Sequence, residues 1–178
     1  MYDFHYGFIK NKYGNRVKLL FTDTDSLCYE VQTKDVYEDM YENKEMFDLS
    51  DVNGKFNDNT NKKVLGKFKP EMTNSTITEF IGLRSKMYST KLDDGREEKK
   101  AKGVVKSVIK KELKHDMYNR ILTTSGKMHS KMTVIRSQKH RLYTMKMNKV
   151  SLSAYDDKRW INNDGISSYA YGHYNTLK

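Results

Sequence analysis

Apolar and polar positions along the first third of the chain alternate with the periods of both helices and strands. An apolar stripe at helical spacing over 1–13 predicts a helix that Gly14 ends. Two apolar runs, 17–22 and 26–33, predict a β-hairpin. Residues 34–47 place apolar side chains between acidic ones, which is typical of an amphipathic helix with a solvated face.

The rest of the chain also mixes the two periods. Turn-forming residues over 48–62 predict a loop, and short β-like runs follow at 63–69, 76–82 and 86–90. The sequence "LDDGRE" then predicts a hairpin turn. Residues 104–124 indicate helices, with a break near Lys114 and His115, before strand character returns after Gly126 in "MHSKMTVIRSQKHRLYTMKMNKVSL". Together these segments predict an α+β fold.

Charge is distributed unevenly along the chain, whose formal net charge is +10. Residues 1–60 carry 7 basic and 12 acidic side chains, a net −5, whereas 61–178 carry 26 and 11, a net +15. Within 99–149, 15 basic residues face only Glu112 and Asp116. The apolar residues inside this block favour a folded basic surface over a disordered tail. Such a surface is typical of proteins that bind nucleic acid.

Several classes of protein are disfavoured by composition. No run approaches the roughly 18 apolar residues of a membrane-spanning helix, so we expect no membrane partner. The N-terminus lacks a signal-peptide pattern. A single cysteine, Cys28, allows neither an internal disulfide nor a thiolate zinc cluster, and the five histidines show no metal-site spacing. An intracellular setting is expected, with nucleus and cytoplasm both open.

Two aspartates interrupt the strand-like sequence "KLLFTDTDSLCYEV". At the tip of a hairpin, Asp23 and Asp25 can project in one direction while Thr24 turns away. Carboxylates about 5 Å apart repel by roughly 3 kcal/mol at an effective dielectric near 20, and Mg²⁺ removes this conflict. A calcium-binding EF-hand loop is excluded, because Cys28 and Lys34 stand where glycine and glutamate are required. Simple turn residues are the alternative.

The motifs around the pair occur in the order of a known family. "FTDTDS" resembles the palm motif Y-x-D-T-D-S of family B DNA polymerases. "EFIGLRSKMYS" followed by "KKAKGV" resembles the K-x-Y motif and the start of the thumb in the protein-primed branch. "VIRSQKHRLYTMKMNKVSLSAYDDKRW" is similar to the C-terminal part of polymerases from virus-like elements of the Polinton/Maverick kind. The resemblance covers essentially the whole chain.

This resemblance implies a partial polymerase palm followed by a small mixed thumb. The palm part, an antiparallel hairpin carrying D-T-D-S plus helices, would span 1–98, the basic thumb 99–160 and a C-terminal tail 161–178. The implied activity is template-directed nucleotidyl transfer by a DNA-directed DNA polymerase in DNA replication. The complete enzyme would use two Mg²⁺ ions, a DNA primer-template and deoxynucleoside triphosphates, with a terminal priming protein as a candidate partner.

The family's site residues transfer motif by motif. Asp25 would be the direct metal ligand and Asp23 the second catalytic carboxylate, with Thr24 and Ser26 fixing the turn. Phe21 stands where the family has tyrosine, so a hydroxyl contact is lost.

Primer and DNA contacts follow from the later motifs. Lys86 and Tyr88 form the K-x-Y motif, and on a strand they would point the same way, toward phosphate and toward the primer sugar or base. Further phosphate contacts are implied at Lys99, Lys100, Lys102, Gly103, Arg136, Lys139 and Arg141.

Two family motifs do not occur in these 178 residues. They are the upstream palm motif D-x-x-S-L-Y-P, which supplies another carboxylate, and the fingers motif K-x-x-x-N-S-x-Y-G, which binds the incoming nucleotide. We therefore expect a C-terminal fragment that is inactive alone, since a two-metal site needs all its ligands. A non-catalytic nucleic-acid-binding remnant and a decayed copy without a selected role are the alternatives.

Overall fold

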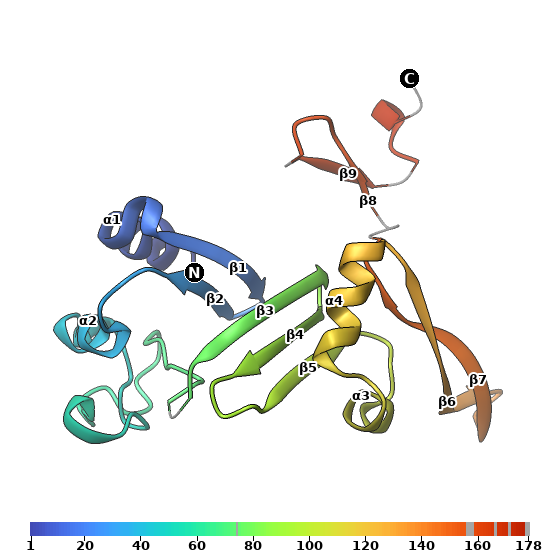
Figure 1. The fold of residues 1–178 in the computed structure, drawn as a ribbon, viewed down its shortest axis with the longest axis horizontal. Coiled ribbons are helices and arrows are strands. Elements are labelled where there is room, and N and C mark those ends of the chain that lie inside the picture. Colours follow the sequence, from blue (N-terminus) through green and yellow to red (C-terminus); the bar gives the residue numbers. More distant parts are fainter. Residues whose placement is uncertain (74, 156–158, 166, 171, 177–178) are drawn as a thin grey trace. The chain divides into compact units, whose positions relative to one another are not determined.

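The chain folds as a mixed α+β protein with small antiparallel sheets and few helices (Figure 1), which confirms the α+β prediction. The computed structural model describes residues 1–73, 75–155, 159–165, 167–170 and 172–176. The chain divides into two compact units: unit 1 is Met1–Thr78 with Leu92–Arg96, and unit 2 is Glu79–Lys91 with Glu97–Lys178. None of the described helices has the length and apolar character needed to span a bilayer.

Unit 1 begins with a continuous helical segment and a hairpin, both as predicted. Its elements are the π-helix η1 (Asp3–Ile9), α1 (Lys10–Tyr13), the 3-10 turn η2 (Gly14–Arg16), β1 (Val17–Asp23), β2 (Ser26–Val31), α2 (Val36–Glu42) and the 3-10 turns η3 (Lys44–Met46) and η4 (Gly54–Phe56). Gly14 ends the first helix with φ +56°, a conformation that glycine adopts without strain. The Asp35 side chain caps α2 by accepting hydrogen bonds from the N–H groups of Tyr37 and Glu38.

Aromatic rings form the centre of unit 1. Phe4 stacks on Phe68 with ring centroids 3.8 Å apart and meets Phe47 edge-on at 5.7 Å. Ile9, Leu49 and other buried side chains complete this core. The strand-like run predicted over 63–69 is therefore wrong: only an isolated bridge pairs Phe68 with Phe47. The Phe68 ring packs in the aromatic core, and none of the strands in the described part of the chain pairs with this run.

Asp39 links three segments of unit 1. Its Oδ2 accepts hydrogen bonds from Thr33 Oγ1 at 2.6 Å and from Tyr13 OH at 3.0 Å, and Lys12 Nζ lies 3.5 Å from Oδ1. Burial opposes ionisation of this carboxyl, but the two hydroxyl donors and the lysine outweigh it, so the pKa of Asp39 is lowered. The carboxylate thus fastens α2 to α1 and to the chain after β2.

Replacing Asp39 with alanine should lower the free energy of unfolding by about 1–3 kcal/mol near neutral pH, because two hydroxyls lose their acceptor. Since the folded-state pKa is lowered, this contribution is complete above the unfolded-state pKa of about 4 and disappears as the pH falls through the folded-state value. Urea unfolding followed by circular dichroism, near pH 7 and near pH 3, measures both effects. Glu38→Ala, an exposed change on the same helix, is the control; equal losses for the two variants would contradict the assignment.

Unit 2 contains most of one three-stranded sheet, two short helices and two hairpins. Its elements are β3 (Ile77–Arg84), β4 (Met87–Leu92), β5 (Glu97–Ala101), α3 (Lys106–Lys111), α4 (His115–Thr124), β6 (Lys127–Gln138), β7 (Arg141–Ser153), β8 (Arg159–Ile161), β9 (Ser168–Ala170) and the 3-10 turn η5 (Tyr174–Thr176). The first two residues of β3 and the last residue of β4 belong to unit 1. The order β3-β4-β5 forms one sheet, and β6-β7 and β8-β9 form separate hairpins. The predicted turn after β4, the helix break before His115 and the returning strands are confirmed.

The core of unit 2 lies between α4 and the β4–β5 strands. Tyr118 and Ile121 of α4 pack with Met87 and Ala101 from the sheet and with Leu152 from β7. The Tyr118 hydroxyl donates to the Lys100 carbonyl at 3.1 Å, and burial raises the pKa of this phenol. This packing gives the sheet one face covered by α4 and fixes the base of the β6–β7 hairpin.

Candidate metal and nucleic-acid sites

A β-bulge decides which way the first aspartate faces. Leu19 of β1 lies opposite Tyr29, but Phe21 lies opposite Cys28, so one extra residue separates the two pairs. Tyr29 packs on the core of unit 1, which places the residues facing Cys28 on the other side of the hairpin. Asp23 follows Phe21 by two positions and therefore lies on this non-core side. The bulge removes the apparent conflict between a charged residue and a buried strand.

The tip of the hairpin is a two-residue turn, Thr24 and Asp25. The Asp25 N–H donates to the Asp23 carbonyl at 2.7 Å, and the Ser26 hydroxyl donates to the same carbonyl at 3.1 Å. The Thr24 hydroxyl donates to Asp23 Oδ1 at 3.3 Å. Thr24 has φ +56°, a left-handed conformation that is costly for a β-branched side chain. The Asp25 side chain is exposed, whereas Asp23 is half-buried.

The aspartate pair offers oxygen donors of the kind that Mg²⁺ prefers. Within the described ranges, no three histidine, cysteine or acidic side chains converge closely enough to hold a metal ion. The nearby thiol is an unsuitable third ligand, because burial, together with the negative charge of Glu71, raises the pKa of Cys28. Asp23 and Asp25 by themselves could supply only two of the oxygen ligands that Mg²⁺ needs, and any others would have to come from phosphates or other protein.

The K-x-Y residues occupy a turn and the strand after it. Lys86 lies in the two-residue connection between β3 and β4, with φ +57° and an exposed side chain. The prediction that Lys86 and Tyr88 project from one strand is therefore wrong, because the strand begins at Met87. Tyr88 is half-buried, and its ring lies 6.0 Å from that of Phe80.

Strand pairing nevertheless brings the predicted DNA-binding residues of this region together. The Lys102 N–H donates to the Lys86 carbonyl at 3.0 Å, and Lys100 lies directly opposite Tyr88. Opposite residues of an antiparallel pair share one face, so Tyr88 and Lys100 are neighbours on the face turned away from α4. We call Lys86, Tyr88, Lys100 and Lys102 the turn cluster.

Gly103 and Lys99 extend this region in different ways. Gly103 has φ +84°, and its carbonyl accepts a hydrogen bond from Lys149 Nζ at 3.0 Å, which adds a cation from β7. A Cβ atom at Gly103 would lie only 2.9 Å from that nitrogen. Lys99 points to the opposite face, where its Nζ lies 3.1 Å from Glu97 Oε2 and its side chain is 14% exposed. Lys99 therefore contributes to the interior ion pair more than to the exposed surface.

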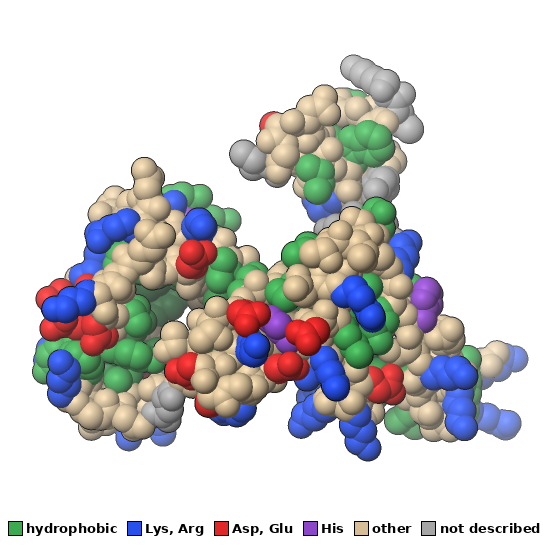
Figure 2. Space-filling model, in the orientation of Figure 1, with side chains coloured by type: hydrophobic (Ala, Val, Ile, Leu, Met, Phe, Trp, Pro, Cys, Tyr) green, Lys and Arg blue, Asp and Glu red, His purple; other side chains and the backbone are tan. Residues whose placement is uncertain are grey.

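The hairpin of β6 and β7, residues 127–153, is the most basic element of the described chain, and we call it the basic ribbon. It contains 7 lysines and arginines and no acidic residue. Arg136, Lys139 and Arg141 are all exposed near its tip, where Lys139 and His140 form a turn with φ values of +45° and +64°. Figure 2 shows lysine and arginine side chains gathered at this end of the ribbon.

Sequence reasoning missed two members of this surface. Tyr143 lies opposite Arg136 on the ribbon and is 44% exposed, and Lys149 reaches Gly103. The partial alternation of apolar and polar residues along β7 was the available signal, but the strand partners needed to place these residues come from the register of the hairpin.

No protein-family model matches the chain, and neither the curated proteins nor the solved structures provide a match.

A string of three polar side chains in unit 2, two of them buried, has the composition of a hydrolase triad. Ser89 Oγ lies 3.0 Å from His115 Nδ1, and His115 Nε2 lies 3.2 Å from Glu79 Oε2. Ser89 is 0% exposed and His115 only 2% exposed, so a substrate carbonyl cannot reach the hydroxyl. A nucleophile needs access to its substrate as well as a base. The string is a structural link between the sheet and α4.

Replacing Ser89 with alanine should therefore lower the free energy of unfolding by about 1–3 kcal/mol, because His115 Nδ1 loses its buried partner. Urea unfolding followed by circular dichroism measures the loss. Ser107→Ala, an exposed change on α3, should stay within about 0.5 kcal/mol of the parent. Hydrolysis of an activated ester by the parent chain, abolished in Ser89→Ala, would contradict the structural assignment.

Proposed function

We propose that the chain is the C-terminal palm and thumb part of a DNA-directed DNA polymerase of the protein-primed family B type. The observation that carries the proposal is the sequence D-T-D-S at the turn of an antiparallel hairpin, with Asp23 on the non-core side. The downstream motifs support it, because the turn cluster and the basic ribbon supply phosphate-binding cations on one unit. In this proposal, unit 1 contributes carboxylates and unit 2 contributes contacts to nucleic acid.

The reaction proposed for the complete enzyme is transfer of a nucleotidyl group to a primer end. The primer 3′ oxygen loses its proton to solvent and bonds to the α-phosphorus of the incoming triphosphate, while the bond to pyrophosphate breaks. Bound Mg²⁺ would lower the pKa of the attacking hydroxyl and neutralise the leaving pyrophosphate. Asp25, with its exposed carboxylate, would be the direct ligand, and Asp23, held by the Thr24 hydroxyl, would complete the chain's share of the site.

The aspartate pair alone is too small a ligand set for this reaction. Two carboxylates leave the metal geometry undefined, and the motif that binds the nucleotide does not occur in the 178 residues. The isolated chain should therefore show no templated primer extension in the presence of Mg²⁺ and all four deoxynucleoside triphosphates. A gel assay of a labelled primer-template measures this. Templated extension that is lost in Asp25→Asn would overturn the assignment of an incomplete site.

The basic ribbon gives a second, separable expectation. At least six phosphate contacts should make affinity for duplex DNA fall about 10³-fold or more between about 50 and about 200 mM salt. Replacing Arg136, Lys139 and Arg141 with alanine should weaken binding and reduce the slope of log K against log salt by about 2–3, since each contact contributes about 0.9. Fluorescence anisotropy of a labelled duplex, measured as a salt series, gives both values.

The matched control removes the same charge elsewhere. Lys10, Lys34 and Lys62 are exposed lysines of unit 1, and their triple alanine variant should keep the slope of the parent. A flat salt response in the parent, or an equal change in both triple variants, would count against the ribbon as a nucleic-acid surface.

A non-catalytic nucleic-acid-binding protein is the second candidate function. The specific observation in its favour is the basic ribbon, which carries 7 basic and no acidic residues. This charge is independent of any role of Asp23 and Asp25 in metal binding. The two candidates differ in one respect: only the polymerase proposal predicts that Asp25→Asn impairs synthesis when the missing palm and fingers segments are supplied. Salt-dependent duplex binding is common to both.

A further inference from the structure

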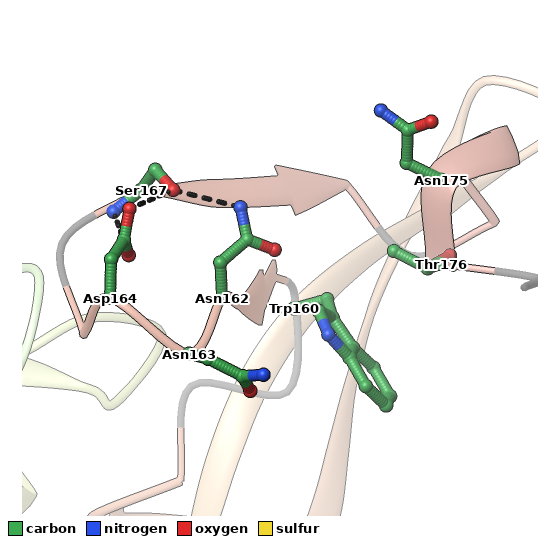
Figure 3. A pocket seen from close by; sticks show the side chains of 7 residues that line it. All are labelled: Trp160, Asn162, Asn163, Asp164, Ser167, Asn175 and Thr176. Carbon is green, nitrogen blue, oxygen red and sulfur yellow. Dashed lines mark hydrogen bonds between the residues drawn. The ribbon is translucent and has the colours of Figure 1, made fainter.

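The β8–β9 hairpin and the η5 turn line a solvent-accessible pocket that has no role in the proposed function. Its volume is about 500 Å³, within the usual range of small-molecule sites. It is lined by Trp160, Asn162, Asn163, Asp164, Ser167, Asn175 and Thr176, as Figure 3 shows. The lining thus combines one large aromatic ring with amides, hydroxyls and a single carboxylate.

One wall of the pocket is fixed by its own hydrogen bonds. The Ser167 hydroxyl donates to Asp164 Oδ2 at 2.6 Å and accepts from Asn162 Nδ2 at 2.8 Å, and the Ser167 N–H donates to Asp164 Oδ1 at 2.9 Å. The Gly165 N–H closes the turn on the Asn162 carbonyl at 2.9 Å. This network engages the carboxylate and leaves the Asn162 side-chain oxygen as an acceptor on the wall.

Two further amides remain available to a ligand. Among the described residues, the side chains of Asn163 and Asn175 form no hydrogen bond, and both residues are exposed. Each primary amide presents donors and an acceptor side by side. In Figure 3 the Asn163 side chain comes from the β8–β9 turn and extends toward Trp160, and the Asn175 side chain comes from η5. Paired donors and acceptors of this kind match the edge of a nucleobase.

The aromatic component lies on β8. Trp160 is 50% exposed and sits directly opposite Tyr169 on β9. Tyr169 in turn stacks on His173 with ring centroids 4.5 Å apart, and His173 lies 4.4 Å from Tyr174. A half-exposed indole beside other flat rings is a stacking platform, since every base has a π-face on which an aromatic side chain can stack.

We propose that this pocket binds one unpaired base of a single-stranded nucleic acid, stacked on Trp160 and hydrogen-bonded by Asn163 and Asn175. The charge of the chain favours this ligand over a neutral sugar, because residues 61–178 carry 26 basic and 11 acidic side chains, a net +15. The site is separate in the sequence from the basic ribbon. It does not depend on the polymerase assignment, which needs only duplex contacts and carboxylates.

Trp160 is the only tryptophan of the chain, so its fluorescence reports directly on the proposed stacking. Titrating the full chain with a short oligothymidylate should quench this fluorescence in a saturable manner. An abasic strand of equal length and charge, a blunt duplex and a neutral oligosaccharide should leave it unchanged. Equal quenching by the abasic strand, or quenching by the oligosaccharide alone, would overturn the proposal.

Variants then separate the base from the backbone. The Trp160→Ala variant should bind a labelled oligothymidylate at least about fivefold more weakly than the parent, as measured by fluorescence anisotropy. Its affinity for duplex DNA should stay that of the parent. Asn163→Ala and Asn175→Ala should each weaken oligothymidylate binding several-fold. Both variants retain Trp160, so the same fluorescence titration can be used. Asn119→Ala, an exposed asparagine on α4, is the control and should have no effect.

The two functional proposals fail independently in these measurements. Loss of ribbon-dependent duplex binding would remove the thumb assignment and leave base-dependent quenching untouched. Unchanged oligothymidylate affinity in Trp160→Ala and in both asparagine variants would remove the base site and leave the salt-dependent duplex binding standing. If Trp160→Ala changes the circular dichroism spectrum of the chain, Trp160→Phe and the asparagine variants decide the question.

Discussion

His115, through its imidazole and its backbone N–H, joins α4 to all three strands of the β3-β4-β5 sheet. Its ring nitrogens contact Ser89 on β4 and Glu79 on β3, and its backbone N–H donates to Glu97 on β5 at 3.1 Å. No side chain at Lys114 caps the helix, so the Glu97 carboxylate from a distant strand receives the first N–H group. Burial on its own would raise the pKa of Glu97, but the hydrogen bonds from Lys99 and from this N–H outweigh burial, so the net effect is a lowered pKa. Because β6 starts shortly after α4, the base of the basic ribbon depends on the same anchor.

The β3-β4-β5 sheet presents two unlike faces. Alternation along β5 sends Lys99 toward the ion pair with Glu97, while Lys100 and the neighbouring turn remain on the other face with Tyr88. Moving the register by one residue would exchange these roles, bringing Lys100 to the covered face and Lys99 to the exposed one. Strand pairing therefore decides which of these lysines is exposed as much as composition does.

Local patterns predicted most elements, because hairpins, caps and helix breaks depend on neighbouring residues. The strand predicted over 63–69 was wrong, since an aromatic core formed by Phe4 and Phe47 competes for the ring of Phe68. The candidate residues could be named from motifs, but their grouping could not. Lys86 and Lys102 meet through a hydrogen bond across the β4–β5 pair, and Lys149 reaches Gly103 over a separation of 46 residues. Such contacts depend on tertiary packing, which no local period encodes.

The extra residue in β1 makes the hairpin sensitive to length in a way that composition does not reveal. Since facing alternates with every residue, deletion of Leu20 would restore regular pairing, yet Leu19 would still lie opposite Tyr29 and Phe21 opposite Cys28, so Asp23 would keep its non-core side. Deletion of Thr22, beyond the bulge, would instead place Asp23 opposite Leu27, which packs on the core of unit 1. The sequence D-T-D-S would be intact in both chains, yet only in the second would a carboxylate face apolar side chains. The effect of an in-frame deletion here therefore depends on its position relative to the bulge, and a residue tally of the motif would miss the difference.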